Sequence, residues 1–137
     1  MKKILVPGLA LACLAAFSAP AHAEGKEAFG RLTVEQVQQL VSNHKAYLFD
    51  NNSKETWAQG HVPSAKWMRF DSVLVKDLPQ DKAAELVFYC GGQKCGACHE
   101  AASQAVGLGY TNVFIMPDGL SGWVAAKKPL EKGNEGA

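Results

Sequence analysis

Apolar residues along this chain alternate between helical spacings and short runs. Val34, Val37, Leu40 and Val41 recur at the three- and four-residue intervals of one helix face, and Thr33 before them suits an N-cap. Short apolar runs between such segments are typical of buried strands. The predicted strands are 46–49, 66–70, 86–89 and 113–115. The predicted helices are 34–41, 54–59 (capped by Ser53) and 97–108, and a short last helix opens at 122–123. Less regular helical turns are predicted at 71–78 and 81–84. This alternation predicts an α/β fold with a mostly parallel central sheet and helices on both faces.

The first residues predict export. Lys2 and Lys3 precede an apolar run over 4–17, which leads to Ala21-His22-Ala23, the small-x-small pattern of a cleaved secretory signal. We expect residues 1–23 to be a signal peptide and the mature protein to be periplasmic or secreted. The run is shorter than the roughly 20 residues of a membrane-spanning helix, so we expect no membrane association after cleavage.

Length and charge restrict what the mature chain can be. About 114 residues suffice for one small domain. We divide them into a lead-in (24–32), a domain (33–130) and a polar tail (131–137). The 14 Lys and Arg against 13 Asp and Glu give a net charge of +1, which falls to near −1 without Lys2 and Lys3. This balance does not favour a nucleic-acid partner, and it leaves the oligomeric state open.

All three cysteines beyond the signal lie between Cys90 and His99, after the strand 86–89 and before the helix 97–108. In parallel α/β folds, ligand sites lie at the carboxyl ends of strands. A loop that enters a helix leaves backbone N–H groups unpaired, and these can hold an anion such as a thiolate. We therefore expect the Cys90 sulfur to have a lowered pKa, to be reachable and to act as a nucleophile. The predicted active-site loop comprises Gly91, Gly92, Gln93, Lys94, Cys95, Gly96 and Ala97.

Two segments resemble the rhodanese-like single-domain sulfurtransferases over residues 33–130. One runs from Leu48 to Ala65 and is similar to the family's pattern of Asp, Glu, aromatic and Gly-His-Ile-Pro-Gly-Ala; the other joins Val87–Cys90, the loop and Gly119–Trp123. The resemblance implies the rhodanese-like fold and a persulfide on Cys90. It implies a small sulfur donor such as thiosulfate, a thiol or cyanide as acceptor, and neither a cofactor nor a metal.

The chain departs from the family pattern at two places. Asn52 stands where the family commonly has an arginine that braces the loop, and Cys98 stands where a loop serine is usual. Lys94 is then the nearest cation, and we expect it to offset donor charge together with the N–H groups of 91–97. Asp50, at the end of a predicted strand, is a candidate supporting residue that accepts hydrogen bonds from the loop region.

The cysteine spacing leaves alternatives open. Cys95 and Cys98 form a Cys-x-x-Cys pair at a helix start, so the chain is alternatively a thiol–disulfide redox or sulfur-carrier protein in which one of them resolves the Cys90 persulfide. In the opposite case, Cys98 only fills the place of the serine. Cys95 to His99 also match the signature of c-type haem, which indicates an electron-transfer protein. A metal site would crowd Cys90, Cys95, Cys98 and His99 into one turn and is disfavoured.

Overall fold

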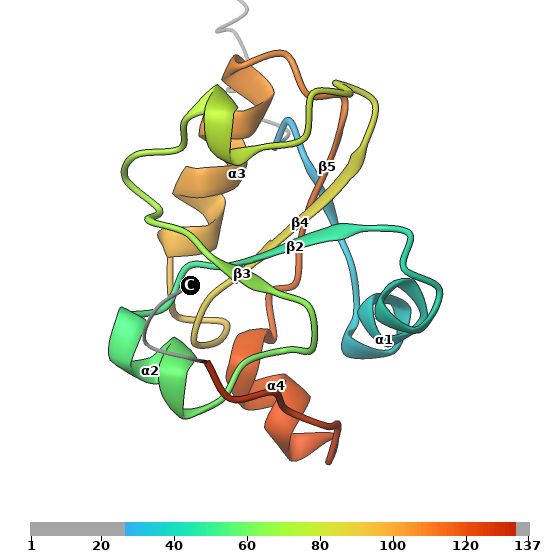
Figure 1. The fold of residues 1–137 in the computed structure, drawn as a ribbon, viewed down its shortest axis with the longest axis vertical. Helices are drawn as coiled ribbons and strands as arrows, with labels where there is room; N and C mark the ends of the chain where they lie inside the picture. Colours follow the sequence, from blue (N-terminus) through green and yellow to red (C-terminus); the bar gives the residue numbers. More distant parts are fainter. Residues whose placement is uncertain (1–26, 134–137) are drawn as a thin grey trace, which may run out of the picture.

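A parallel sheet forms the centre of the computed structural model, which describes residues 27–133. Its strands are β1 (Gly30–Arg31), β2 (Tyr47–Asp50), β3 (Lys66–Trp67), β4 (Glu85–Tyr89) and β5 (Asn112–Ile115). They lie in the order β1-β5-β4-β2-β3, and every pairing is parallel (Figure 1). The predicted α/β class with a parallel sheet is therefore confirmed. The predicted signal peptide, 1–23, lies outside the described residues.

The first two helices begin where their capping residues predict. The helices are α1 (Val34–Ser42), α2 (Lys54–Gln59), α3 (Ala97–Gly107) and α4 (Gly119–Ala125), with a 3₁₀ turn at Val75–Asp77. Thr33 and Gln36 exchange side-chain and backbone hydrogen bonds in a capping box. Ser53 accepts the Thr56 N–H at the start of α2. Within the described residues, no helix is both long and apolar enough to cross a membrane.

Five segments differ from the expected pattern, the first of which is the predicted strand 66–70, where only Lys66–Trp67 forms a strand. Residues 71–78 hold only the 3₁₀ turn, and 81–84 form a single turn in which the Asp81 carboxylate accepts the Ala83 N–H. The last helix begins at Gly119 instead of Gly122, because Gly119 adopts a φ of 57° that turns the chain directly out of the segment after β5. The two-residue strand β1 was not predicted, since so short a strand has no periodicity.

Side chains of the central strands alternate between two apolar layers. Leu86 and Phe88 of β4 pack with α3, whereas Val87 and Tyr89 pack with α1 and α4. In Figure 1, α3 lies on the left of the sheet and α1 on the right. Cys90, the residue after β4, belongs to the layer of α3. The last residue of the strand and the first thiol of the loop therefore face opposite sides of the sheet.

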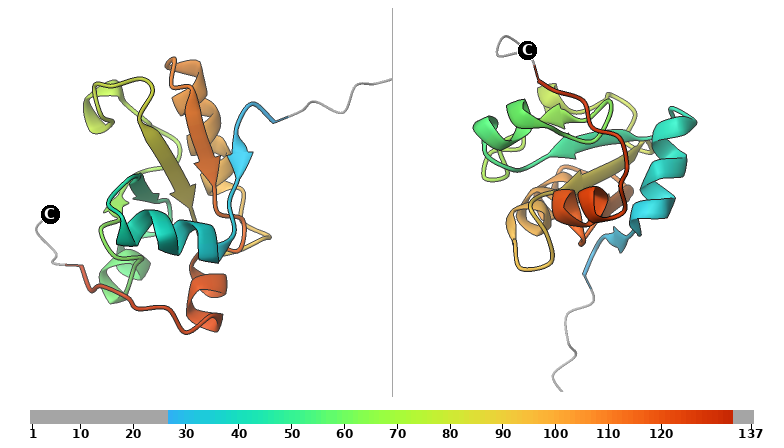
Figure 2. Two further views of the ribbon diagram at one scale, coloured as in Figure 1. Left: turned by 90° about the vertical axis from the view of Figure 1, so that its right-hand side faces the viewer. Right: turned by 90° about the horizontal axis from the view of Figure 1, so that it is seen from below.

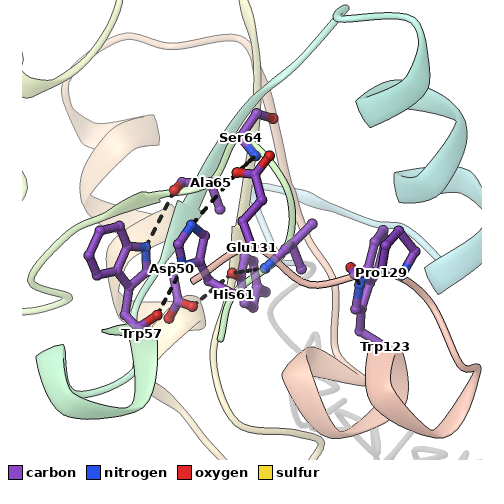
Figure 3. A network of polar contacts seen from close by, with 10 residues as sticks. Asp50, Trp57, His61, Ser64, Ala65, Trp123, Pro129 and Glu131 are labelled. Atoms are coloured by element: carbon purple, nitrogen blue, oxygen red, sulfur yellow. Dashed lines mark hydrogen bonds and ion pairs between the residues drawn. The ribbon is translucent and has the colours of Figure 1, made fainter. Parts of the chain in front are cut away.

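The C-terminal segment runs from α4 past α2, as both views of Figure 2 show. His61 and Glu131 exchange backbone hydrogen bonds of 2.8 and 2.9 Å, and the Glu131 carboxylate accepts the Ser64 N–H at 2.9 Å (Figure 3). The Gly133 N–H donates to the Ala58 carbonyl of α2 at 3.2 Å. Residues 131–133, which the sequence assigned to a polar tail, thus bond to the domain.

Two buried tryptophans lie along this segment (Figure 3). The Trp57 ring stacks on His61 with 4.4 Å between ring centroids. Trp123 is fully buried, and its Nε1 donates to the Pro129 carbonyl at 2.7 Å. The segment therefore covers apolar surface as well as pairing with backbone groups.

Truncation after Leu130 tests what residues 131–137 contribute to stability. The truncation removes the bonds that Glu131 and Gly133 make to His61, Ser64 and Ala58. These are four hydrogen bonds, and at about 1 kcal/mol net for each we expect the free energy of unfolding to fall by roughly 4 kcal/mol. Urea unfolding of the two chains measures this difference, and coincident unfolding curves would show that the segment does not stabilise the domain.

Candidate active site

The loop between β4 and α3 lies at the carboxyl edge of the sheet. β4 is the central strand, and its neighbours β2 and β5 end beside it, with Asp50 in register with Tyr89. Cys90 follows the strand directly, and the chain enters α3 at Ala97. The sequence thus places the cysteine cluster at the edge where parallel sheets hold their ligands.

Three thiols converge at this position. The Cys90 Sγ lies 3.5 Å from the Cys95 carbonyl oxygen, to which it donates, and it also contacts the thiols of Cys95 and Cys98. Cys90 and Cys98 are each 1% exposed, whereas Cys95 is partly exposed. All three are free thiols. The structure therefore brings the predicted nucleophile and both predicted resolving thiols together, with Cys95 outermost.

The charge on this cluster differs from the expectation. The hydrogen bond between the Cys90 and Cys98 thiols is the main cause that raises the pKa of Cys90, and burial adds to it. The same hydrogen bond lowers the pKa of Cys98, and the N–H groups of Cys98 and His99 add to this effect. The expectation of an accessible Cys90 with a lowered pKa is wrong, because Cys90 is buried and its thiol contacts the thiol of Cys98. Cys98 loses its proton first.

The loop carries the unpaired N–H groups that the sequence predicts. In the described part of the chain, the N–H groups of residues 91–94 and 96–99 donate to no protein oxygen, whereas the Cys95 N–H donates to the Gly92 carbonyl at 2.9 Å. The Cys98 N–H points to the Cys90 sulfur. Lys94 is exposed and forms no ion pair with any described residue. Residues 91–95 and Ser121 line a shallow hollow of about 420 Å³.

The start of α4 supports the loop from the other side. The Leu120 N–H donates to the Cys90 carbonyl at 2.8 Å, and both the N–H and the hydroxyl of Ser121 donate to the Gly91 carbonyl. The Gln93 side chain donates to the Asp118 carboxylate at 2.7 Å. Asp118 and Ser121 were not predicted as supporting residues, although Ser121 lies in the Gly119–Trp123 motif. The sequence pointed to Asp118 only as an acidic residue that lies between a predicted strand and a predicted helix.

Gly119 is required where α4 meets the loop. A Cβ atom on this residue would lie 2.4 Å from the Cys90 carbonyl oxygen and 2.7 Å from the Gly92 nitrogen. Its φ of 57° also lies in the left-handed region that favours glycine. A side chain at position 119 would thus displace the backbone that carries the thiols.

Asp50 supports the site from the opposite face of the sheet. It is fully buried; one carboxylate oxygen accepts the Asn52 N–H at 2.8 Å and the other accepts the Tyr89 hydroxyl at 2.7 Å. The Tyr89 oxygen in turn accepts the Val62 N–H. Burial raises the pKa of Asp50, and these hydrogen bonds oppose the rise. Asp50 therefore braces the ends of β2 and β4, and the thiols lie in the other layer.

Asn52 occupies the position of the missing arginine, beside the loop. A Cβ atom on Gly91 would lie 3.5 Å from its side-chain oxygen, and its carbonyl accepts the Trp67 Nε1–H at 3.0 Å. The Asn52 side chain is neutral, so it lies against the loop at Gly91 without adding charge. Lys94 is thus the cation of the loop.

The arrangement does not fit c-type haem. Covalent attachment requires both motif sulfurs to reach the porphyrin, but the Cys98 sulfur lies in the core against Cys90. The His99 Nδ1 lies 3.0 Å from the Glu27 carboxylate, and its ring packs edge-on against Phe29. Among residues 27–133, no group of three or more His, Cys, Asp or Glu side chains is arranged to hold a metal ion.

Tyr89→Phe tests the brace behind the loop. The substitution leaves the buried Asp50 carboxylate and Val62 N–H without this partner, and we expect it to destabilise the fold by about 3 kcal/mol at pH 7. Burial and the charge of Asp50 raise the pKa of Tyr89 above its ordinary value of 10.0. The folded protein therefore keeps a proton that the unfolded chain loses, so this residue's contribution to stability falls as the pH rises above about 10.

Urea unfolding between pH 7 and pH 11 measures both effects. The free energy of unfolding of the wild type should fall more steeply above pH 10 than that of Tyr89→Phe. Parallel profiles would contradict a raised pKa at this tyrosine.

Thiol labelling tests the burial of the cluster. Iodoacetamide should modify Cys95 before Cys90 and Cys98, because only Cys95 is partly exposed. Gln93→Ala removes the bond between the loop and Asp118. Losing this bond destabilises the closed loop by about 1 kcal/mol, so we expect Cys90 to be labelled roughly fivefold faster.

Peptide mapping by mass spectrometry follows each thiol separately. Gln59→Ala is a matched control, since Gln59 is exposed and its side chain makes no hydrogen bond in the described structure. Equal labelling of Cys90 and Cys95 in the wild type would contradict the buried position of Cys90.

Comparison with known proteins gives the family. Residues 33–126 match the model of the rhodanese-like domain. The uncharacterized protein YibN of Escherichia coli is 22% identical over 107 residues, which are 74% of this chain and 72% of YibN.

Two solved structures share the fold. The BH2092 protein of Bacillus halodurans matches with a TM-score of 0.69 and 17% identity, over 75% of this chain and 77% of that protein. The human single-domain sulfurtransferase TSTD1 matches with a TM-score of 0.60 and 22% identity, over 70% of this chain and 96% of that protein. With the family model matched over most of the described residues, the chain belongs to the rhodanese-like domain family.

Proposed function

We propose that this protein is a sulfurtransferase that moves a sulfane sulfur from a thiosulfate-like donor to a thiol or cyanide acceptor through a persulfide on Cys90. The observation that carries the proposal is the position of Cys90, at the end of the central strand, beneath a loop of unpaired N–H groups and in contact with two other thiols. The name of the similar human protein, a sulfurtransferase, agrees with it.

The first step loads the sulfur. The pKa of Cys98 is lowered and that of Cys90 is raised, so the Cys98 sulfur accepts the Cys90 proton as the Cys90 sulfur attacks the outer sulfur of thiosulfate. The bond between the two thiosulfate sulfurs breaks, and sulfite leaves with its electron pair. Thiosulfate and sulfite are anions, and the N–H groups of the loop with the Lys94 ammonium offset their charge.

The second step unloads the sulfur. A thiolate or cyanide attacks the outer sulfur of the persulfide, and Cys90 leaves as a thiolate that regains its proton from Cys98. No resident cofactor takes part in either displacement. Because thiosulfate and the thiolate or cyanide acceptor bind at one site in turn, the same N–H groups serve the loading and the unloading step.

Access to Cys90 requires the loop to open. With 1% of the residue exposed, a donor in the hollow above the loop reaches the sulfur only when residues 91–95 move. The Gln93–Asp118 bond and the two Ser121 bonds hold the loop closed. Loading is thus coupled to loop motion.

We also propose that the chain works outside the cytoplasm. The proposal is supported by Lys2, Lys3, the apolar run and Ala21-His22-Ala23 in the sequence. Cleavage after Ala23 would release a domain that includes the whole family match.

Cys90→Ser tests the sulfurtransferase function. Sulfide release from thiosulfate, with dithiothreitol as the acceptor, should be abolished because serine cannot form a persulfide. Cys95→Ser is the matched control, and it should retain the activity since Cys95 contacts Cys90 without carrying the sulfur. Activity that survives in Cys90→Ser would refute the proposal, and a wild type that stops after one equivalent of sulfide would be a carrier.

A further inference from the structure

We propose that Cys98 is the resolving thiol of this protein, which converts the Cys90 persulfide into a Cys90–Cys98 disulfide and releases sulfide. The inference rests on the proposed function and adds a reductive step to it. Sulfur transfer alone requires one cysteine, whereas the Cys90 thiol here contacts the free thiols of both Cys95 and Cys98.

The geometry separates the roles of the two candidate thiols. Cys98 lies in the first turn of α3 and is buried with Cys90 in the same apolar cluster. The N–H groups of Cys98 and His99 point to the Cys98 sulfur, so a thiolate is stabilised there. Solvent thiols have no access to this contact while the loop is closed. Cys98 is therefore the neighbour that meets a persulfide first.

Cys95 has a different environment. It lines the surface hollow with Lys94 and is partly exposed, so it faces incoming solutes. Its N–H is also the one loop N–H, within residues 91–99, that pairs with a backbone carbonyl, which holds it in the Gly92–Cys95 turn. These features favour a position at the entrance over a role at the persulfide.

The step balances without a further reactant. The Cys98 sulfur attacks the Cys90 Sγ, the bond between Cys90 and the outer sulfur breaks, and the outer sulfur leaves with the electron pair and the Cys98 proton as hydrosulfide. The two cysteines are oxidised to a disulfide, and the sulfane sulfur is reduced to sulfide. Renewed activity needs an external dithiol, which returns both cysteines to thiols by exchange.

Single loading with thiosulfate tests the inference. Reduced protein without free reductant is treated anaerobically with thiosulfate at pH 9, and its intact mass and the released sulfide are measured. The wild type should lose two hydrogens and release one equivalent of sulfide, and peptide mapping should locate the disulfide between Cys90 and Cys98. Cys98→Ser should gain one sulfur atom, removable by cyanide, and release no sulfide.

Matched controls distinguish the possible failures. Gln59→Ala should behave as the wild type, Cys95→Ser should still form the Cys90–Cys98 disulfide, and circular dichroism checks that each variant is folded. A wild type that keeps the added sulfur beside free Cys98 would overturn the resolving role and leave the sulfurtransferase intact. A disulfide mapped to Cys95 would also overturn the role of Cys98. If neither protein gains sulfur nor releases sulfide, both proposals fall.

Discussion

The backbone contact between the start of α4 and the first residues after β4 is the constraint on which the site depends. Gly119 lies so close to the carbonyl of Cys90 that no side chain fits, and the next two residues donate to the carbonyls of Cys90 and Gly91. With these carbonyls paired, the backbone of Cys90 and Gly91 is held against the start of α4. The position of the thiols is thus set by a helix nearly thirty residues further along the chain.

Burial and charge then divide the chemistry between sulfurs. A thiolate in an apolar layer is costly unless donors surround it, and the first turn of α3 provides such donors at Cys98. The contact with the Cys98 thiol and burial raise the pKa of Cys90, so this sulfur holds its proton more tightly. Reactivity in the cluster is therefore a property of the pair, because the protonation of one sulfur decides whether the other can attack. A serine at position 98, as in the family pattern, would leave Cys90 without this partner.

Local signals predicted more of the structure than distant contacts did. The capping residues Thr33 and Ser53 and the apolar run of β4 act within a few residues, and the elements begin where they indicate. The Gln93–Asp118 bond spans 25 residues, so no local pattern announces it. The raised pKa of Cys90 was missed for the same reason, since it comes from the arrangement of side chains across the folded loop. The family was predicted from the resemblance of two separated segments to rhodanese-like proteins, because no single residue or local pattern is specific to that family.

The opposite orientation of Tyr89 and Cys90 separates structural support from chemistry at a single peptide bond. Asp50, Tyr89 and the Val62 N–H close a polar network in the layer of α1 and α4, while the thiols lie in the layer of α3. Residues of the loop can be exchanged without removing a member of that network. A scaffold of this kind can diversify its reactive groups through evolution at little risk to foldability, and an additional pair of cysteines is one such elaboration.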